Sequence, residues 1–323
     1  MWENDSLPWL KKQYSVIFAL HTTVLVKNLA GCLVHVIAVV QNKGGVGKTT
    51  VTRVLAEYFA RRGRRVLAVD LDAQCNLSRR FVDMEYDAAD PDGVLPPLHP
   101  MFHDDDSGWS GRSSSADIYF NGEVYPYPTR IDGLDALPGH GPRLREIELV
   151  RVDDVRERVH DRLYAFLSLA EVRQSYDIVL VDTAPAKGPL TISAMRAATH
   201  VIIPTTLEPQ PIEGLFGMLQ LWRQEMHSRD AGRAPLKIAA IQPNLFRKVA
   251  LHEGILDSLR KDAAVASLLS PVILHQRIAF AESDHAEARP KSIFDLAERD
   301  PARQEAIEMC EYVERSLSGL GVA

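Results

Sequence analysis

The sequence has few of the features that mark several large classes of protein. It contains only three cysteines, Cys32, Cys75 and Cys310, and none of them forms a CxxC pair. A disulfide framework and a zinc or iron–sulfur site are therefore not indicated, and the cytoplasm is the compartment that we expect. The longest N-terminal apolar run, from Tyr14 to Val26, is too short to span a bilayer.

The chain also lacks an excess of positive charge. Lys and Arg total 37 against 43 Asp and Glu, and the formal net charge of −6 argues against a polybasic protein that coats nucleic acid or membrane. The acidity is concentrated between Phe81 and Ser110, where eight acidic residues occur without a Lys or Arg. Turn-forming Pro, Gly and Ser residues punctuate positions 81–127, so we predict a loop insertion with partial disorder there. We favour a solvated acidic loop over a metal cluster at His103 to Asp106.

From Val34 onward, short apolar runs alternate with amphipathic stretches. This alternation predicts an α/β fold with a doubly wound, mostly parallel sheet, in a single domain over residues 34–323. The expected strands are Val34–Val40, Arg65–Leu71, Asp177–Val181, His200–Pro204 and Lys237–Ile241. The expected helices are Lys48–Arg62, Val155–Ala170, Leu190–Ala198, Gly214–His227, Ile255–Leu269 and Pro301–Leu317.

Residues 1–33 form an N-terminal extension ahead of this pattern. The stretch Leu29 to Cys32 resembles a lipoprotein cleavage box, but Lys27 and Asn28 stand where a cleavage region should be uncharged. Export would also leave the protein without access to ATP, although a nucleotide-binding motif follows directly after this extension. We therefore interpret the extension as an extra packed helix or strand, or as the product of a start codon assigned too early.

The strongest motif follows the first predicted strand and opens a helix. Its sequence from Gln41 to Thr50 is QNKGGVGKTT. Glycines let successive backbone N–H groups surround phosphates, a lysine reaches the outer phosphates, and a hydroxyl is placed for Mg²⁺. The motif predicts a P-loop that binds ATP and Mg²⁺, with the cradle and ligand residues Gly44, Gly45, Val46, Gly47, Lys48, Thr49 and Thr50.

One residue departs from the common P-loop pattern. Lys43 stands five residues before Lys48, within a KGGxGKT run. In this feature the sequence resembles the ParA/MinD family of deviant Walker ATPases, a branch of the P-loop NTPases. In that family the early lysine crosses to the nucleotide of a second subunit. The resemblance therefore implies an ATP-sandwiched homodimer in which Lys43 stabilises charge on the transferring phosphate.

Two aspartates follow apolar strands and extend the resemblance. Asp72 lies in a segment like the first switch of the family, although Ala73 replaces the usual proline. The resemblance implies that Asp72 positions the attacking water near Mg²⁺. Asp182 ends a strand like the Walker B strand and would hold Mg²⁺ through water. Because carboxyl ends of parallel strands share one edge of the sheet, we expect both carboxylates to converge on the P-loop.

Motifs later in the chain indicate which branch of the ParA/MinD family the sequence resembles. Residues 204–209 and Gln242 to Asn244 end two strands where this family holds base and sugar, so Asn244 either pairs with adenine or forms a turn. Residues 274–282 and 289–293 look like the carboxyl-terminal region of Soj-like partition ATPases.

The resemblance therefore implies a plasmid- or chromosome-partitioning ATPase. Its MgATP dimer would bind DNA non-specifically on the nucleoid, and slow hydrolysis, stimulated by a centromere-binding partner protein, would release it. A MinD-like membrane-surface ATPase and a non-hydrolysing DNA-bound scaffold are the alternatives. We expect no stable membrane association, because the C-terminus lacks a basic amphipathic helix. The candidate DNA contacts are Arg247, Lys248, Arg260, Lys261 and Arg277.

Overall fold

A computed structural model describes residues 34–88, 90, 93–102, 109–283 and 292–318. The N-terminal extension and the segment from His103 to Asp106 lie outside the described residues, as does the stretch 289–291. Within the described ranges, no helix combines the length and the apolar character needed to cross a membrane.

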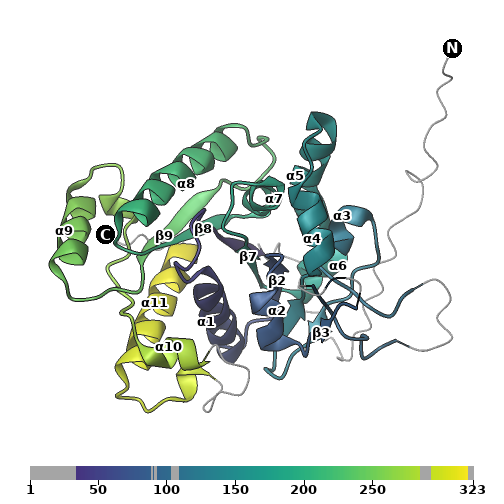
Figure 1. The fold of residues 1–323 in the computed structure, drawn as a ribbon, viewed down its shortest axis with the longest axis horizontal. Helices are drawn as coiled ribbons and strands as arrows, with labels where there is room; N and C mark the ends of the chain where they lie inside the picture. The colour runs from purple at the N-terminus through teal and green to yellow at the C-terminus, as the bar shows by residue number, and fades with distance from the viewer. Residues whose placement is uncertain (1–33, 89, 91–92, 103–108, 284–291, 319–323) are drawn as a thin grey trace.

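A seven-stranded sheet forms the centre of the molecule (Figure 1). Its order is β5-β6-β2-β7-β1-β8-β9, and every neighbouring pair is parallel except β5 with β6. The strands are β1 (His35–Val39), β2 (Val66–Leu71), β5 (Tyr127–Pro128), β6 (Leu134–Leu137), β7 (Ile178–Thr183), β8 (His200–Thr205) and β9 (Lys237–Pro243). The predicted doubly wound, mostly parallel sheet is confirmed.

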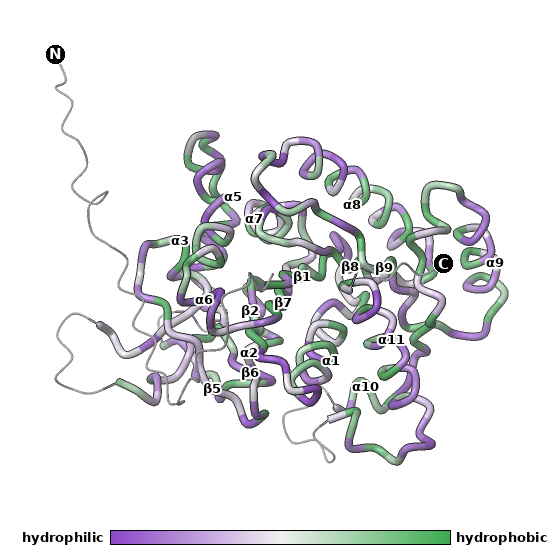
Figure 2. The backbone as a smooth tube through the Cα atoms, turned by 180° about the vertical axis from the view of Figure 1, so that it is seen from behind, coloured by the Kyte–Doolittle hydropathy of each residue, from purple (hydrophilic) through white to green (hydrophobic). Residues whose placement is uncertain are grey.

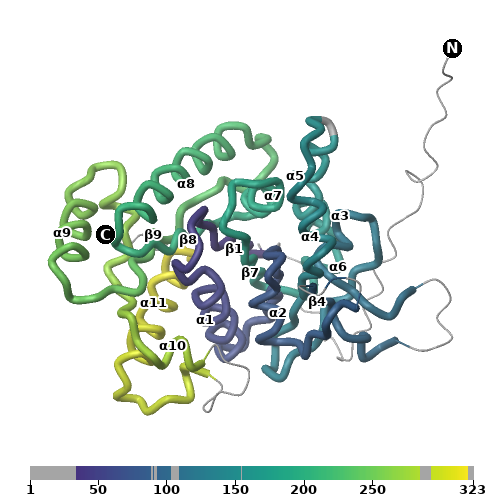
Figure 3. Tube along the Cα trace, in the orientation of Figure 1, coloured from purple at the N-terminus to yellow at the C-terminus, as the bar shows by residue number. Residues whose placement is uncertain are grey.

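Helices cover both faces of this sheet. One face packs against α1 (Lys48–Arg61) and α11 (Pro301–Leu317), which lie side by side although they come from opposite ends of the chain (Figure 3). The other face carries α5 (Asp153–Leu167), α7 (Pro189–Ala197) and α8 (Pro209–His227). Hydrophobic colouring follows the central strands between these layers (Figure 2). The remaining helices are α2 (Asn76–Phe81), α3 (Asp117–Phe120), α4 (Gly141–Glu148), α6 (Ala170–Ser175), α9 (Ala250–Lys261) and α10 (Ile278–Ser283), with 3-10 turns η2 (Ala266–Leu268) and η3 (Ile293–Asp295).

The predicted helices agree with the structure to within three residues at each end, except two that differ by more. The helix expected from Ile255 to Leu269 begins at Ala250 and ends at Lys261. It ends there because the Asp262 carboxylate accepts a hydrogen bond from the backbone N–H of Ala264 at 2.8 Å, which closes a turn instead of another helical residue. The helix expected from Gly214 begins at Pro209, since prolines are tolerated in a first turn whose N–H groups have no helical acceptor.

The predicted loop insertion at positions 81–127 contains short regular elements. Its described residues include β3 (Glu85–Tyr86), β4 (Val94–Leu95), α3 and the start of β5, and His99 packs between the rings of Trp109 and Tyr127. Arginines that lie outside positions 81–110 pair with its carboxylates. These pairs are Arg112 with Glu85, Arg130 with Asp83, and Arg145 with Asp90. Most of the described residues from 82 to 126 have no regular secondary structure, as predicted, but local composition does not reveal these distant partners.

The helix α1 carries a buried ion pair on the face that meets the C-terminal segment. Arg53 and Glu57 are each 1% exposed, and their side chains are 3.2 Å apart. Arg53 also donates to the Ser283 hydroxyl at 2.8 Å, and the Ser292 hydroxyl donates to Glu57. These contacts attach α10 and η3 to the first helix of the fold.

We expect Glu57→Ala to destabilise the protein by about 3 kcal/mol, because the buried Arg53 guanidinium would lose its carboxylate. Urea unfolding of the full chain measures the change. The control is Asp153→Ala, which breaks the exposed pair with Arg156 and should cost less than about 1 kcal/mol. Equal effects of the two substitutions would contradict the importance of the buried pair.

Candidate functional site

The loop between β1 and α1 has the shape of an anion cradle. Gly45 and Gly47 have φ angles of 73° and 86°, a left-handed conformation that favours glycine. A Cβ atom built on Gly44 or Gly45 would meet no atom within 4 Å, so the space beside the loop is open. Since α1 begins directly after Gly47, its N-terminal N–H groups add partial positive charge at the loop. Phosphate groups fit this arrangement.

Lys48 lies inside the cradle. Its side chain is buried, and its Nζ donates to the backbone carbonyl of Lys43 at 3.4 Å. Burial lowers the pKa of Lys48, while the nearby carboxylates of Asp182 and Asp72 raise it. This hydrogen bond across the loop is long, so an anionic phosphate oxygen can replace the carbonyl oxygen as the partner of Lys48.

Asp182 meets the P-loop from the neighbouring strand β7. The Thr49 hydroxyl donates to its Oδ2 at 2.6 Å, and the Thr52 hydroxyl donates to its Oδ1 at 3.4 Å. Burial, together with the charge of Asp70, raises the pKa of Asp182 to about 8. A fully buried carboxylate with a hydroxyl beside it is a donor set that suits Mg²⁺ with its retained waters. Thr49 and Asp182 are therefore brought together as expected, and they fit the metal.

Asp72 follows β2 directly and lies on the same edge of the sheet. Its side chain is 8% exposed, and its Oδ1 accepts the backbone N–H of Gln74 at 3.0 Å. Its charge contributes to the pKa shifts of both Lys48 and Asp182. The predicted convergence of the two carboxylates on the P-loop is present in the structure, and the role of Asp72 in positioning water stays a prediction.

Asp70 is a residue whose importance we did not predict. Its Oδ1 accepts the backbone N–H of Asp72 at 3.0 Å, and its Oδ2 accepts the N–H and the hydroxyl of Ser78 at 2.8 and 2.6 Å. Burial raises the pKa of Asp70 to about 6. The signal available in the sequence was a charged residue inside an otherwise apolar strand. Its carboxylate fixes the path of the loop that carries Asp72.

Asn244 lies against the P-loop. It is 5% exposed, its Nδ2 donates to the carbonyl of Val46 at 2.8 Å, and its Oδ1 accepts the N–H of Leu245 at 2.9 Å. A Cβ on Gly47 would lie only 2.2 Å from Nδ2. Asn244 therefore connects the end of β9 to the P-loop, and its pairing with adenine stays a prediction.

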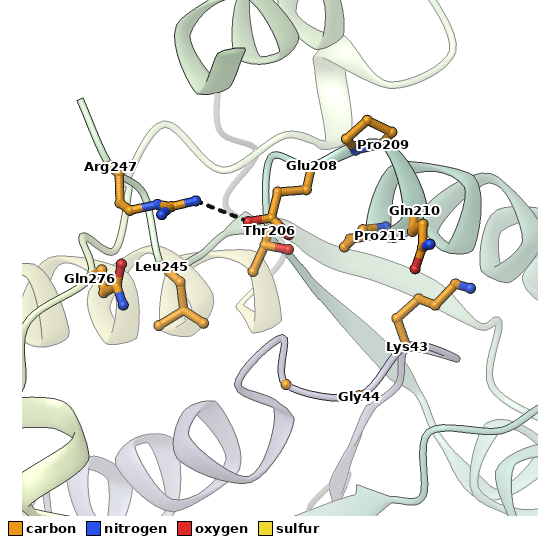
Figure 4. A pocket seen from close by; sticks show the side chains of 11 residues that line it. Lys43, Gly44, Thr206, Glu208, Pro209, Gln210, Pro211, Leu245, Arg247 and Gln276 are labelled. Atoms are coloured by element: carbon orange, nitrogen blue, oxygen red, sulfur yellow. Dashed lines mark hydrogen bonds and ion pairs between the residues drawn. The ribbon is translucent and has the colours of Figure 1, made fainter. Parts of the chain in front are cut away.

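A cavity of about 680 Å³ opens beside the P-loop. In Figure 4, Lys43 and Gln210 lie on one side of it, and Leu245, Arg247 and Gln276 lie on the other. The volume suits a small organic ligand. The full lining comprises Lys43, Gly44, Gly45, Thr206, Glu208, Pro209, Gln210, Pro211, Leu245, Arg247 and Gln276.

The five candidate DNA contacts lie around α9 and the two loops beside it. Three of them have carboxylate partners. Arg247 contacts Glu208 at 3.2 Å, Arg260 contacts Asp257 at 3.6 Å, and the Arg277 Nε donates to Glu305 at 3.1 Å. Lys248 and Lys261 are exposed. These residues lie in the same part of the molecule, but their contact with DNA stays a prediction.

Comparison with known proteins agrees with the geometry. The family profile described as CobQ/CobB/MinD/ParA nucleotide binding domain matches residues 37–288. The chain is 36% identical over 190 residues to a Sinorhizobium fredii protein named replication protein A, covering 57% of this chain and 42% of that protein. It is 31% identical over 191 residues to the chromosome-partitioning ATPase Soj of Thermus thermophilus, covering 57% and 59%. The chain thus spans about half the length of these relatives.

Two solved structures share the fold. McdA of Cyanothece in complex with ATP superposes with a TM-score of 0.67 at 15% identity, covering 88% of this chain and 96% of that chain. A Borrelia burgdorferi protein described as a plasmid partition protein, bound to AMPPNP, gives 0.62 at 17% identity, covering 89% and 100%. These neighbours support the fold assignment alone.

We expect Asn244→Ala to weaken binding of ATP about five- to tenfold, because the P-loop loses a buried hydrogen bond. Calorimetric titration with ATP and GTP separates the two roles of this residue. If Asn244 only supports the P-loop, the affinities for both nucleotides fall by the same factor. A loss confined to ATP would instead assign the amide to the adenine base.

Proposed function

The chain belongs to the CobQ/CobB/MinD/ParA nucleotide-binding family, and from this premise we propose that it is a DNA-partitioning ATPase. In this proposal MgATP drives the formation of a homodimer, the dimer binds DNA on the nucleoid, and hydrolysis releases it. The Soj relative named above supports the assignment. Hydrolysis acts as a switch, so it is slow until a centromere-binding partner stimulates it.

The main support for the proposal is that Lys43 and Lys48 lie on one loop but have different environments. Lys48 is buried in the cradle, whereas Lys43 is half-buried on the rim of the cavity. A Cβ on Gly214 of α8 would lie 3.0 Å from the Lys43 Cγ, so the stem of this lysine lies against α8. In this proposal Lys48 holds phosphates in its own subunit, and Lys43 reaches those of a second copy.

The remaining site residues have separate tasks in this mechanism. The N–H groups of the P-loop and Lys48 bind the phosphates, and Thr49 and Asp182 hold the metal site in place. Mg²⁺, when bound, neutralises charge that develops on the phosphate oxygens. Asp72, fixed by its loop beside the P-loop, orients the attacking water. Lys43 of the second subunit stabilises the charge of the transferring group.

We expect Lys43→Ala to keep its affinity for ATP but to lose ATP-dependent dimerisation, because this ammonium acts across the interface. Lys48→Ala should instead bind ATP at least tenfold more weakly, since the cradle loses the lysine held inside it. Light scattering and nucleotide titration measure the two effects. Lys237→Ala, an exposed lysine at the start of β9, serves as the control. A normal ATP dimer in Lys43→Ala would refute the role of Lys43.

We expect binding of DNA to require ATP, to ignore sequence and to weaken with salt. If the dimer neutralises about four to six phosphates, log K falls with log salt with a slope of roughly −4 to −5. Arg260→Glu combined with Lys261→Glu should make this slope shallower by about one unit for each phosphate that is no longer neutralised. Arg156→Glu on α5 is the matched control, because it changes an exposed charge far from α9 (Figure 1).

The measurement is a titration of labelled random duplex DNA at two salt concentrations, with anionic vesicles as a second surface. Binding to vesicles without binding to DNA would overturn the partition assignment and favour the membrane-surface alternative. DNA binding with ATP but without any hydrolysis would favour the scaffold alternative.

A further inference from the structure

The helix α4 lies between the two loops that follow Asp72 and Asp182. At its first residue, a Cβ on Gly141 would lie 2.8 Å from the carbonyl oxygen of Ala73, in the loop that carries Asp72. At its last residue, Glu148 reaches the start of α7, the helix that follows Asp182. α4 therefore contacts both loops, one with each end.

The contact at the second loop is close and specific. A Cβ on Gly188 would lie 1.7 Å from the Glu148 Oε2, so only glycine leaves room for this carboxylate. Gly188 has a φ of −83°, which any residue can adopt, and its role here is therefore space and not backbone freedom. The carboxylate lies beside the first N–H groups of α7, and the backbone of Leu190 lowers the pKa of Glu148, while Oε1 has no hydrogen-bond partner among the described residues.

The environment of Glu148 is consistent with a fixed carboxylate. Burial raises the pKa of Glu148 above its usual value, the backbone of Leu190 and the charge of Arg151 oppose this in part, and the charge of Asp72 raises the pKa further. A negative charge at the N-terminus of α7 also interacts favourably with the helix dipole. The short loop from Ala184 to Gly188 is thus held at both ends, by β7 on one side and by Glu148 on the other.

We propose that Glu148 is a positioning residue for the loop between Asp182 and α7, and that α4 couples this loop to the one that carries Asp72. The rate effects expected below rest on the proposed ATPase function. The contact itself does not, because it is a property of the free chain. Glu148 does not line the cavity and does not contact the P-loop glycines, so it positions the second loop through α7, and its charge also acts on Asp72.

The insertion at positions 81–127 contacts α4 and so takes part in this coupling. Arg145 of α4 pairs with Asp90, Arg143 pairs with Asp117, and His140 lies 3.7 Å from Asp87. The backbone of β4 also lies close to Gly141, whose Cβ would be 3.7 Å from the Val94 nitrogen. The insertion therefore keeps α4 in place over the first loop, and through Glu148 it influences the second.

The first test is amide hydrogen exchange of the free protein over residues 184–192. We expect Glu148→Ala to speed exchange at Leu190 at least tenfold and Glu148→Gln to retain most of the protection, because glutamine fills the same space beside Gly188 and keeps an oxygen beside the first N–H groups of α7. Glu146→Ala, an exposed residue of the same helix, is the control. Unchanged exchange at Leu190 in Glu148→Ala overturns the proposal, whether or not the chain hydrolyses ATP.

The second test is a double-substitution cycle with Gly188→Ala, read in kcat and in the affinity for ATP. Each single variant should lower kcat about tenfold with little change in affinity, since phosphate binding is untouched. In Glu148→Ala the space for a Cβ is free, so adding Gly188→Ala should cause no further loss. Additive losses overturn the coupling. If the wild type hydrolyses no ATP under any condition, the proposed function fails, and the exchange experiment still decides the role of Glu148.

Discussion

The parallel pairing of β2, β7 and β1 is the constraint on which the site depends. The register places Asp182 beside Val39 on one side and beside Asp70 on the other. The P-loop follows β1, Asp72 follows β2, and Asp182 lies near the end of β7, so the loop and the two carboxylates meet at one edge of the sheet. The same register forces two carboxylates, Asp70 and Asp182, to be buried as neighbours. Burial raises the pKa of both, so a cation that binds at this edge relieves a repulsion that the fold itself creates.

The two loops that approach the phosphates are held by different means. The loop after β2 is fixed from within by Asp70, and the Ser115 hydroxyl from the insertion also donates to the Asp70 carbonyl at 2.5 Å. The loop after β7 has its anchor on another helix, at Glu148. The P-loop has a third support in Asn244, which comes from the end of β9. Contacts from Asp70, Glu148 and Asn244 thus fix the three loops at this edge of the sheet, which glycine residues alone would leave flexible.

Local patterns were sufficient for the centre of the fold and for most of the site. β1, β2, β7, β8 and β9 are buried runs of Val, Ile and Leu, and the P-loop is a continuous motif, so each could be found within a short window. The roles that depend on distant contacts could not. Asn244 meets Val46 across 198 positions. Arg53 and Glu57 have the spacing of an ordinary exposed helix pair, and nothing near them indicates burial. In the same way, nothing within positions 81–110 indicates its ion pairs, because the partners Arg112, Arg130 and Arg145 lie elsewhere in the chain.

The buried pair on α1 also places a condition on the order in which this chain is made. Arg53 and Glu57 hydrogen-bond to Ser283 and Ser292, which lie 230 and 235 positions later. At a synthesis rate of about 5 to 20 residues per second, the first helix waits roughly 10 to 50 seconds before these partners exist. During that time its charged face has no cover from α10 and η3, while its other face can already pack on the early strands. The nucleotide cradle at the start of α1 is therefore synthesised early and becomes rigid late, when the last part of the chain closes over the helix that carries it.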